Sequence, residues 1–556
     1  MSESLETPTA ANLGTASSEI LSQLNMSNVF SHIQYFSTIQ TRVTGYPGAD
    51  EAANYIAQQF QSLGLKVKIQ EFQVLVPVDQ DANITVIADG TTFKAYPLWP
   101  NLVQCSPTPL GGVTGRLIYV GSGELEDFDG KEVSGSIVLM DFNSMWNWIN
   151  AAKLGAKAVV FIEPEDTTRM ESETKVLNTP IYFPRIYVKR DIGAALLRLI
   201  SNENEVTVNL KSSMSFEEKT AKNVIGILEG QEIRDQLMLL AAHYDSWSPV
   251  PSLAPDAQAS VRIASLLELA RVLASNPPKR TVWFVALSGH YQQAAGSREF
   301  TEQYYFQNQT FESGAKKIIL FTDLHLSADS PLVMWDSARK GIGVGYEILQ
   351  WWITRVTRVY EPVFPPDVLA NYRTPANIKR NAHVIDPYDL DSAPISYAGP
   401  WAFSYITVET LHQDFFSPIN NIEKIRLDYL EPQLKFALYT FNDMANLNLT
   451  GTDPPLRDWV SGQRFYRGLV ATAAGAGVIP LTGRVEEFNY RTGFYEPVPN
   501  ALVVLNRISG EAITSDSGTM TNHMSVERFS PLFGHVITKA DANDFYRFNS
   551  VEVSVS

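Results

Sequence analysis

One stretch decides the fold: Leu237-Met-Leu-Leu-Ala-Ala-His243-Tyr-Asp245-Ser246. Its run of apolar residues predicts a strand that is buried on both faces, and the strand ends in a histidine and an aspartate. Open α/β sheets place their chemistry at the carboxyl ends of strands. We therefore interpret His243 as a possible metal ligand and Asp245 as a carboxylate that orients it. The alternative is a capped strand end with a satisfied histidine.

Strands and helices alternate on both sides of this stretch. Upstream, the sequence predicts a helix over 19–40, an amphipathic helix over 51–63 and a strand over 222–228. Downstream it predicts an amphipathic helix through Leu266 and Leu273, a helix over 291–306, a helix-rich stretch near 341–358, and strands over 281–287, 317–323 and 404–408. This alternation predicts an α/β fold with a doubly wound, mostly parallel sheet.

Three other regions differ from this pattern. Residues 1–18 are polar and predict a flexible lead-in, and residues 86–215 alternate short strands with glycine turns, which indicates a β-rich insert. Residues 447–477 predict a connector. Residues 478–556 consist of short strands and turns, which predict a small β-sandwich.

Composition excludes several classes of function. The formal net charge of −16 disfavours nucleic acid and anionic membrane surfaces as partners, because both would be repelled. The single cysteine, Cys105, excludes an intrachain disulfide and a cysteine-based zinc site. With eight histidines in the chain, any metal site must be built from histidine and carboxylate.

We expect an extracellular or cell-surface location. No apolar run reaches the ~18 residues that a membrane span needs. The first 25 residues lack the pattern of a signal peptide, so we expect export by another route or a leader outside this sequence. Asn-x-Ser/Thr sequons, which are potential glycosylation sites, occur at Asn25, Asn83, Asn308 and Asn448.

Several landmarks in order make the chain resemble the zinc-dependent aminopeptidase family, which includes secreted bacterial leucyl aminopeptidases and glutamate carboxypeptidase II. They include Arg42-Val-Thr-Gly-Tyr-Pro-Gly48 and His243-Tyr-Asp-Ser246. The resemblance implies a peptidase-like domain over 19–85 and 216–446, with a protease-associated domain inserted at 86–215. Residues 478–556 resemble a carboxypeptidase regulatory-like β-sandwich, through Leu481-Thr-Gly-Arg-Val and Asp541-Ala-Asn-Asp-Phe.

The resemblance also implies a ligand set. Active members hold two zinc ions through histidines, an aspartate, a glutamate and a bridging aspartate, with a second glutamate as general base. His243 matches the first histidine ligand and Asp245 matches the carboxylate that orients it. Asp323 matches the aspartate ligand, and His412, in Glu409-Thr-Leu-His-Gln-Asp, matches the last histidine.

Other positions depart from the family pattern. His290 and Tyr291 stand where the family has the base and the ligand glutamate. The bridging aspartate normally precedes Asn-x-Ser-Gly, and a gapless alignment on Leu266 to Arg271 places Gln258 there. Asp256 can take that role only if two residues are inserted. The usual Ser-Asp-His-x-Pro reads Leu390-Asp-Ser-Ala-Pro394.

These departures favour a degenerate site. Glutamine carries no charge to bridge two cations, and a tyrosine hydroxyl titrates near ~10. We therefore expect no metal or one zinc-like ion, held by His243, Asp323 and His412 with help from Asp256, His290 or His325. The leading hypothesis is a non-hydrolytic extracellular module that binds a protein partner or assembles with itself. The alternative is a metal-dependent exopeptidase acting on peptides, in which His290 or Asp245 handles protons.

Overall fold

The structure is a computed structural model. It describes residues 19–202, 205–307, 317–336, 390–398, 401–408, 412–449, 476–506 and 535–554, with residues 351, 355, 359–360, 364, 410 and 468–469. The lead-in at 1–18, most of the helix-rich stretch near 341–358, most of the connector and the sequon at Asn308 lie outside the described residues. Within the described part, no helix has both the length and the apolar character that crossing a membrane requires.

The helices are α2 (Met26–Thr38), α3 (Pro47–Ser62), α4 (Trp148–Lys153), α5 (Arg169–Glu173), α6 (Arg190–Asn202), α7 (Ala257–Ser275), α8 (Ala295–Thr301), α12 (Ala393–Ala398) and α13 (Leu427–Asn446). The helix predicted over 291–306 is interrupted. A short turn, η2 (His290–Gln292), precedes α8, and a π-helical turn follows it over Glu302–Gln307. Positive φ angles of 59° at Gln293 and 50° at Ala294 break the helix between η2 and α8.

The strands of the main sheet are β1 (Lys66–Val86), β2 (Thr92–Lys94), β3 (Tyr96–Pro97), β4 (Val113–Tyr119), β5 (Ile137–Asp141), β6 (Ala158–Ile162), β7 (Arg185–Val188), β8 (Thr207–Leu228), β9 (Ile233–His243), β10 (Arg280–Leu287), β11 (Lys317–His325), β12 (Val333–Asp336) and β13 (Ala402–Thr407). Their order is β12-β13-β11-β9-β10-β8-β4-β5-β6-β7-β3, with β1 and β2 attached to β8. The pairs β10–β9, β9–β11 and β11–β13 are parallel, which confirms the predicted α/β class.

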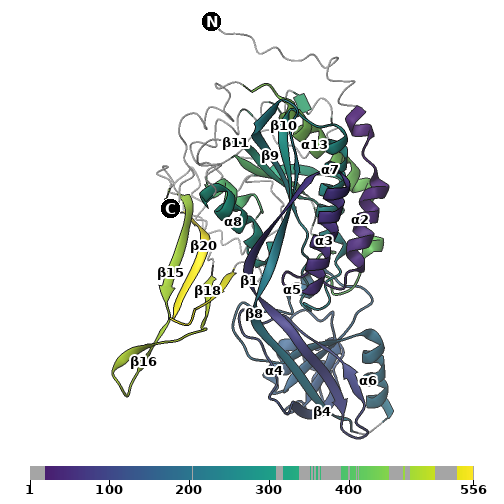
Figure 1. The fold of residues 1–556 in the computed structure, drawn as a ribbon. Coiled ribbons are helices and arrows are strands. Elements are labelled where there is room, and N and C mark those ends of the chain that lie inside the picture. Colours follow the sequence, from purple (N-terminus) through teal and green to yellow (C-terminus); the bar gives the residue numbers. More distant parts are fainter. Residues whose placement is uncertain are drawn as a thin grey trace, which may run out of the picture.

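Strand β9 lies between two parallel neighbours, which suits its uninterrupted apolar sequence. Leu237 to His243 are all buried, and β10 and β11 pair with its two edges. Helices α2, α3, α7 and α13 share one apolar cluster on one side of the sheet, and the α8 and α12 region packs on the other through Phe300 and Ile395. Figure 1 shows α2 and α3 side by side along this body. The peptidase-like domain is therefore layered on both faces of the sheet.

The insert is joined to this domain by two long antiparallel strands. β1 and β8 pair from Lys66 with Ile227 to Val86 with Val208. In Figure 1 they run as one ribbon from the α/β body down to the lobe that carries α4, α6 and β4. The chain enters the insert at the end of β1 and returns at the start of β8, so both connections are held by one ladder.

The C-terminal strands form separate small sheets. They are β14 (Gly468–Leu469), β15 (Ala476–Arg484), β16 (Glu486–Asn489), β17 (Phe494–Pro497), β18 (Leu502–Asn506), β19 (His535–Lys539) and β20 (Phe545–Ser554). β15 lies between β14 and β20, and β16–β17 and β18–β19 are antiparallel pairs. Figure 1 places β15 and β20 beside the α/β body on the side of α8. The predicted C-terminal β-region is therefore present.

Candidate functional site

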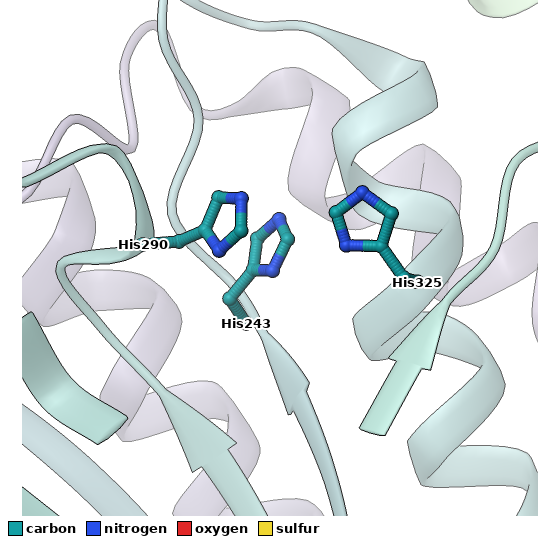
Figure 2. A group of neighbouring side chains, drawn as sticks. All are labelled: His243, His290 and His325. Atoms are coloured by element: carbon teal, nitrogen blue, oxygen red, sulfur yellow. The ribbon is translucent and has the colours of Figure 1, made fainter. Parts of the chain in front are cut away.

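Three histidines meet at the carboxyl edge of the main sheet. His243 is the last residue of β9, His325 is the last residue of β11, and His290 follows β10 in the turn η2. These strands are parallel neighbours, so their carboxyl ends converge. One ring nitrogen from each histidine lies within 4.8 Å of the others, and all three side chains are buried. Figure 2 shows the rings of His243 and His290 facing one another, with His325 beside them.

Strand register explains why His325, rather than Asp323, joins this cluster. Asp323 pairs with Ala241 across the β9–β11 ladder. The residue two positions further along each strand lies on the same face, so His325 is level with His243. The Asp323 side chain instead accepts a hydrogen bond from Ser404 Oγ on β13. Burial raises the pKa of Asp323 to about 7.

Asp391 holds two of the histidines in place. Its Oδ2 lies 2.9 Å from His243 Nδ1 and 3.1 Å from His290 Nδ1, and the stacked rings are 3.7 Å apart at an interplanar angle of 8°. Burial lowers the pKa of His290, but the Asp391 carboxylate outweighs burial and leaves that pKa raised. Burial would raise the pKa of Asp391, but the two histidines hold it well below its usual range.

Arg262 supplies a second buried cation at the centre of the cluster. It lies on α7, a helix buried along most of its length, and its guanidinium donates to His243 Nε2 and, over 3.2 Å, to His325 Nε2. Its Nε donates to the main-chain oxygen of Leu326 at 3.3 Å, and the group lies 5.0 Å from the ring centre of Phe415. Arg262 is thus fixed on several sides.

The two partners of His243 determine its protonation. A guanidinium only donates hydrogen bonds, so Nε2 of His243 must accept and Nδ1 must carry the proton that faces Asp391. Burial, followed by the charges of His290 and Arg262, lowers the pKa of His243 well below its usual value. His243 is therefore a neutral imidazole whose lone pair points at an arginine.

Most of the other predicted site residues make structural contacts outside the cluster. Asp256 caps the start of α7, where Ala259 N donates to it at 3.3 Å and Phe416 N at 2.8 Å. Asp245 accepts from Thr44 Oγ1 at 3.0 Å. Burial raises the pKa of Asp256 and of Asp245 to about 6. These carboxylates stabilise the loops around the sheet edge.

His412 and Gln258 both contact the carboxylate of Asp329. His412 Nδ1 lies 3.3 Å from Asp329 Oδ2, while Gln258 Nε2 donates to Asp329 Oδ1 at 2.7 Å. The other end of the Gln258 amide accepts from Ala328 N at 3.1 Å. The structure therefore brings His243, His290 and His325 together, while Asp323 and His412 contact other residues.

The sequon residues lie on the surface or at its edge. Asn25 caps α2 and accepts from Ser27 N at 2.9 Å, and Asn448 accepts from Lys279 Nζ at 3.1 Å. Asn83 is half-buried in β1. Glycosylation of these residues stays a prediction.

Comparison with known proteins agrees with this architecture. The family model of peptidase family M28 matches residues 223–331, which span β8 to β11, and the PA domain model matches residues 113–196 within the insert. The chain is therefore similar to the zinc aminopeptidase family, and the family model covers the segment that carries the three histidines. The chain is 27% identical over 303 residues to aminopeptidase YwaD of Bacillus subtilis, which covers 53% of this chain and 62% of that protein.

Two further relatives define how far the likeness extends. Transferrin receptor protein 1 of Gallus gallus is 31% identical over 108 residues, which cover 18% of this chain and 13% of that protein. The crystal structure of a peptidase M28 precursor from Shewanella amazonensis has a TM-score of 0.50 at 15% identity and covers 78% of this chain and 97% of that chain. This structural likeness concerns the fold alone. The chain matches less than two thirds of the length of the curated relatives.

The described residues do not fit a pair of zinc ions in this arrangement. A zinc aminopeptidase needs a carboxylate between the ions, but Gln258 holds Asp329 with its amide and Asp256 caps a helix. A cation site also needs free lone pairs, yet the Nε2 atoms of His243 and His325 accept hydrogen bonds from Arg262. The guanidinium lies between the imidazoles that a metal would use.

Sequence reasoning missed the roles of Arg262 and Asp391. In the gapless alignment on α7, the glycine of the Asn-x-Ser-Gly pattern falls on Arg262, so a long cation replaces a residue without a side chain. That exchange was a usable signal. Asp391 keeps the aspartate of the Ser-Asp-His-x-Pro pattern, but its two histidine partners lie 148 and 101 residues away in the sequence. No local pattern indicates those contacts.

Proposed function

We propose that this zinc-aminopeptidase-fold protein does not hydrolyse peptides and acts as an extracellular binding or assembly module. One observation carries the proposal: the Arg262 guanidinium binds His243 and His325 at the nitrogens that would hold a metal ion. The chain itself places a positive charge where the family holds a cation. Asp391 provides the matching carboxylate through its two histidine contacts.

An arginine cannot replace the chemical work of zinc. Zinc lowers the pKa of a bound water and so supplies hydroxide at neutral pH. A guanidinium has no open coordination position and stays protonated. It can balance charge and orient the histidines, but it does not generate a nucleophile. This chemistry supports a site that is kept for its structure.

The residue at the position of the general base also argues against turnover. A general base must be unprotonated at the working pH. His290 is bonded to Asp391, and its raised pKa favours the protonated ring. Tyr291, at the position of the ligand glutamate, packs edge-on against His290 with ring centres 5.0 Å apart. These contacts favour a charge-balanced network over a catalytic pair.

A binding role agrees with the accessory regions. The PA insert and the C-terminal sheets together give the chain two surfaces beyond the α/β body. One relative is named as a receptor, transferrin receptor protein 1, which supports a binding function within this fold. Fold likeness alone does not fix function, so the partner must be found by experiment.

The second candidate function is a metal-dependent exopeptidase with one ion. The close approach of three imidazoles favours it, since their nitrogens lie within 4.8 Å. This function requires Arg262 to leave the cluster. His290 or Asp245 would then handle protons.

A turnover assay separates the two functions. We expect the purified chain to release no product from leucyl-nitroanilide or from unblocked dipeptides, with or without added zinc or cobalt. The matched control is His243→Ala, which should give the same background rate. Product formation that His243→Ala abolishes would overturn the proposal and favour the exopeptidase.

A further inference from the structure

A two-stranded hairpin projects from the C-terminal region. Strand β15 leads into β16, the chain turns over residues 490–493, and β17 returns beside β16. Among the described strands, these two pair only with each other. At the base of the hairpin, Val485 N donates to the main-chain oxygen of Asp544 at 3.0 Å. Figure 1 shows β16 extending past the ends of β15 and β20, away from the α/β body.

The large aromatic side chains of this hairpin are exposed to solvent. Tyr490 is 92% exposed, Phe494 73% and Tyr495 67%, and Phe488 is exposed as well. Every residue of β17 is exposed. A two-stranded hairpin with no covered face is only marginally stable in water. Exposed apolar side chains that gather on one element mark a site of interaction.

One face of the hairpin carries a cluster of three rings. Phe488 and Tyr495 form a cross-strand pair, so their side chains share a face, and their ring centres are 5.2 Å apart. The ring of Tyr490 packs edge-on against Phe488, also at 5.2 Å. Glu486 lies two residues before Phe488 on the same strand and therefore on the same face. A carboxylate thus flanks an assembled aromatic surface.

The opposite face places two carboxylates directly across from each other. Glu487 pairs with Glu496, and the next pair on this face is Asn489 with Phe494. Like charges directly opposite each other destabilise a sheet. Glu496 accepts hydrogen bonds from Asn489 Nδ2 at 2.7 Å and from Thr492 Oγ1 at 3.3 Å, and these neutral donors fix the carboxylate without balancing its charge. This face therefore favours a cation from outside the hairpin.

The charges of the hairpin determine which partner fits it. Residues 485–498 contain three glutamates and one arginine, Arg491, which gives a formal charge of −2 in a chain of net charge −16. Anionic lipid headgroups would be repelled. A second copy bound through the same patch would bring the same carboxylates together. Arginine and lysine side chains fit both faces, because they form charge-assisted hydrogen bonds with carboxylates and lie favourably over aromatic rings.

We propose that the β16–β17 hairpin is a docking surface for a basic segment of a partner protein. The inference names a partner class for the proposed binding function and rests on that function. Basic side chains of the partner lie over the rings of Phe488, Tyr490 and Tyr495. On the other face, a basic side chain between Glu487 and Glu496 removes the repulsion of the two carboxylates.

Isothermal titration of the full chain with acetyl-hexaarginine amide tests this proposal. We expect hexaarginine to bind, and acetyl-hexaglutamate amide, which has the same length and the opposite charge, not to bind. Maltohexaose, phosphatidylcholine vesicles and sedimentation of the chain alone test a carbohydrate, a lipid surface and a second copy. Equal binding of the two peptides would overturn the proposal. Failure of hexaarginine to bind, whether or not one of the other occupants does, would also overturn it.

Paired aromatic variants locate the binding. Tyr490→Ala with Tyr495→Ala should weaken hexaarginine about tenfold, because two cation–π contacts are lost. Tyr490→Phe with Tyr495→Phe keeps both rings and should keep the wild-type affinity. Trp146→Ala with Tyr182→Ala removes two exposed aromatic side chains from the insert and should leave the affinity unchanged. An equal loss in the two alanine pairs, or no loss in the hairpin pair, would contradict the site.

Paired charge variants test the carboxylates. Glu487→Gln with Glu496→Gln should weaken hexaarginine about fivefold, because two ion pairs at exposed positions are lost. Glu126→Gln with Glu132→Gln changes the net charge by the same amount at exposed positions of the insert and should leave the affinity unchanged. Equal weakening by both pairs would show that hexaarginine responds to net charge alone and would overturn the site.

Turnover of leucyl-nitroanilide in the same samples keeps the two proposals distinct. Hydrolysis would contradict the non-hydrolytic function and leave the hairpin proposal standing if hexaarginine binds. Absence of both binding and hydrolysis would overturn the hairpin proposal, while the non-hydrolytic function would stand.

Discussion

The histidine cluster and a cavity of about 210 Å³ lined by Gln292 are neighbours, because Tyr291 lines the cavity and packs against His243 and His290, and they differ in what satisfies their polar groups. In the cluster, the chain provides both the cation, Arg262, and the carboxylate, Asp391. In the cavity, the Gln292 amide has no partner among the described residues. The polar groups of the histidine cluster are therefore satisfied from within the chain, whereas those of Gln292 are not.

Replacing Asp391, the carboxylate of the histidine cluster, should cause the largest loss of stability. Asp391→Asn keeps the shape of the side chain but leaves Arg262 and a protonated His290 without a buried counter-charge. We expect a loss of about 3–5 kcal/mol in the stability of the α/β body, since breaking a buried ion pair at one partner costs that much. Denaturant unfolding followed by circular dichroism measures it. Asp129→Ala, at an exposed turn, is the control. An equal, small change in both variants would show that the cluster is not an internal ion network.

The second prediction distinguishes a helix cap from a metal ligand at Asp256. Its pKa is raised to about 6 by burial, whereas an unfolded aspartate titrates near ~3.9. The folded state thus holds the Asp256 proton more tightly than the unfolded state does. The stability that this proton contributes is therefore greatest below the pKa of the unfolded chain and is lost as pH rises through the pKa of the folded chain. The expected loss is roughly 3 kcal/mol between about pH 4 and about pH 6.

Asp256→Asn should remove this pH dependence, because asparagine caps a helix nearly as well and does not titrate. Unfolding midpoints at a series of pH values measure the slope, with wild type as the reference. If the slope is unchanged and the variant loses bound zinc instead, Asp256 is a ligand and the cluster is not closed.

The third prediction is that removing the Arg262 side chain allows the histidine cluster to bind zinc. Arg262→Gly restores the residue of the family pattern and frees the imidazole nitrogens of His243 and His325. We expect this variant to gain one zinc ion and to be stabilised by about 2.7 kcal/mol when free zinc is about 100 times its Kd. Thermal unfolding with and without zinc measures the gain. Adding His325→Ala should abolish it. A gain equal to that of wild type would show that Arg262 does not exclude the metal.

The smallest expected effect is that of restoring the family's two glutamates, which should leave turnover absent. His290→Glu combined with Tyr291→Glu restores the family's base and ligand but leaves Arg262 in the cluster and Gln258 bonded to Asp329. We expect no hydrolysis of leucyl-nitroanilide in the presence of zinc. Activity in this double variant would mean that the two glutamates alone had been missing.

Much of the fold could be predicted from the sequence because it depends on local patterns. The apolar run before His243 predicts a central strand, and the alternation around it predicts the α/β sheet; both are confirmed. The register between strands is not local. Asp323 was favoured over His325 as a ligand, but the pairing of Asp323 with Ala241 brings His325 level with His243.

The cluster itself was beyond sequence reasoning for a similar reason. The sequence predicts His243 and His290 as site residues, and the structure places them side by side, but the contact that joins them is made by Asp391 from a distant segment. Arg262 lies on the apolar helix α7, where periodicity indicates core packing and gives no sign of a buried cation. The exchange of the family's glycine for Arg262 is visible in the sequence, but the histidines that this cation binds are identified only when the side chains are placed in space.

Zinc content tests the central claim most directly. The full wild-type chain would be incubated with zinc, freed of unbound metal by gel filtration and measured by elemental mass spectrometry, with Arg262→Gly treated in parallel. If Arg262 takes the place of the metal, wild type retains no stoichiometric zinc and the variant retains one ion per chain. Wild type that retains one or two zinc ions would contradict the account.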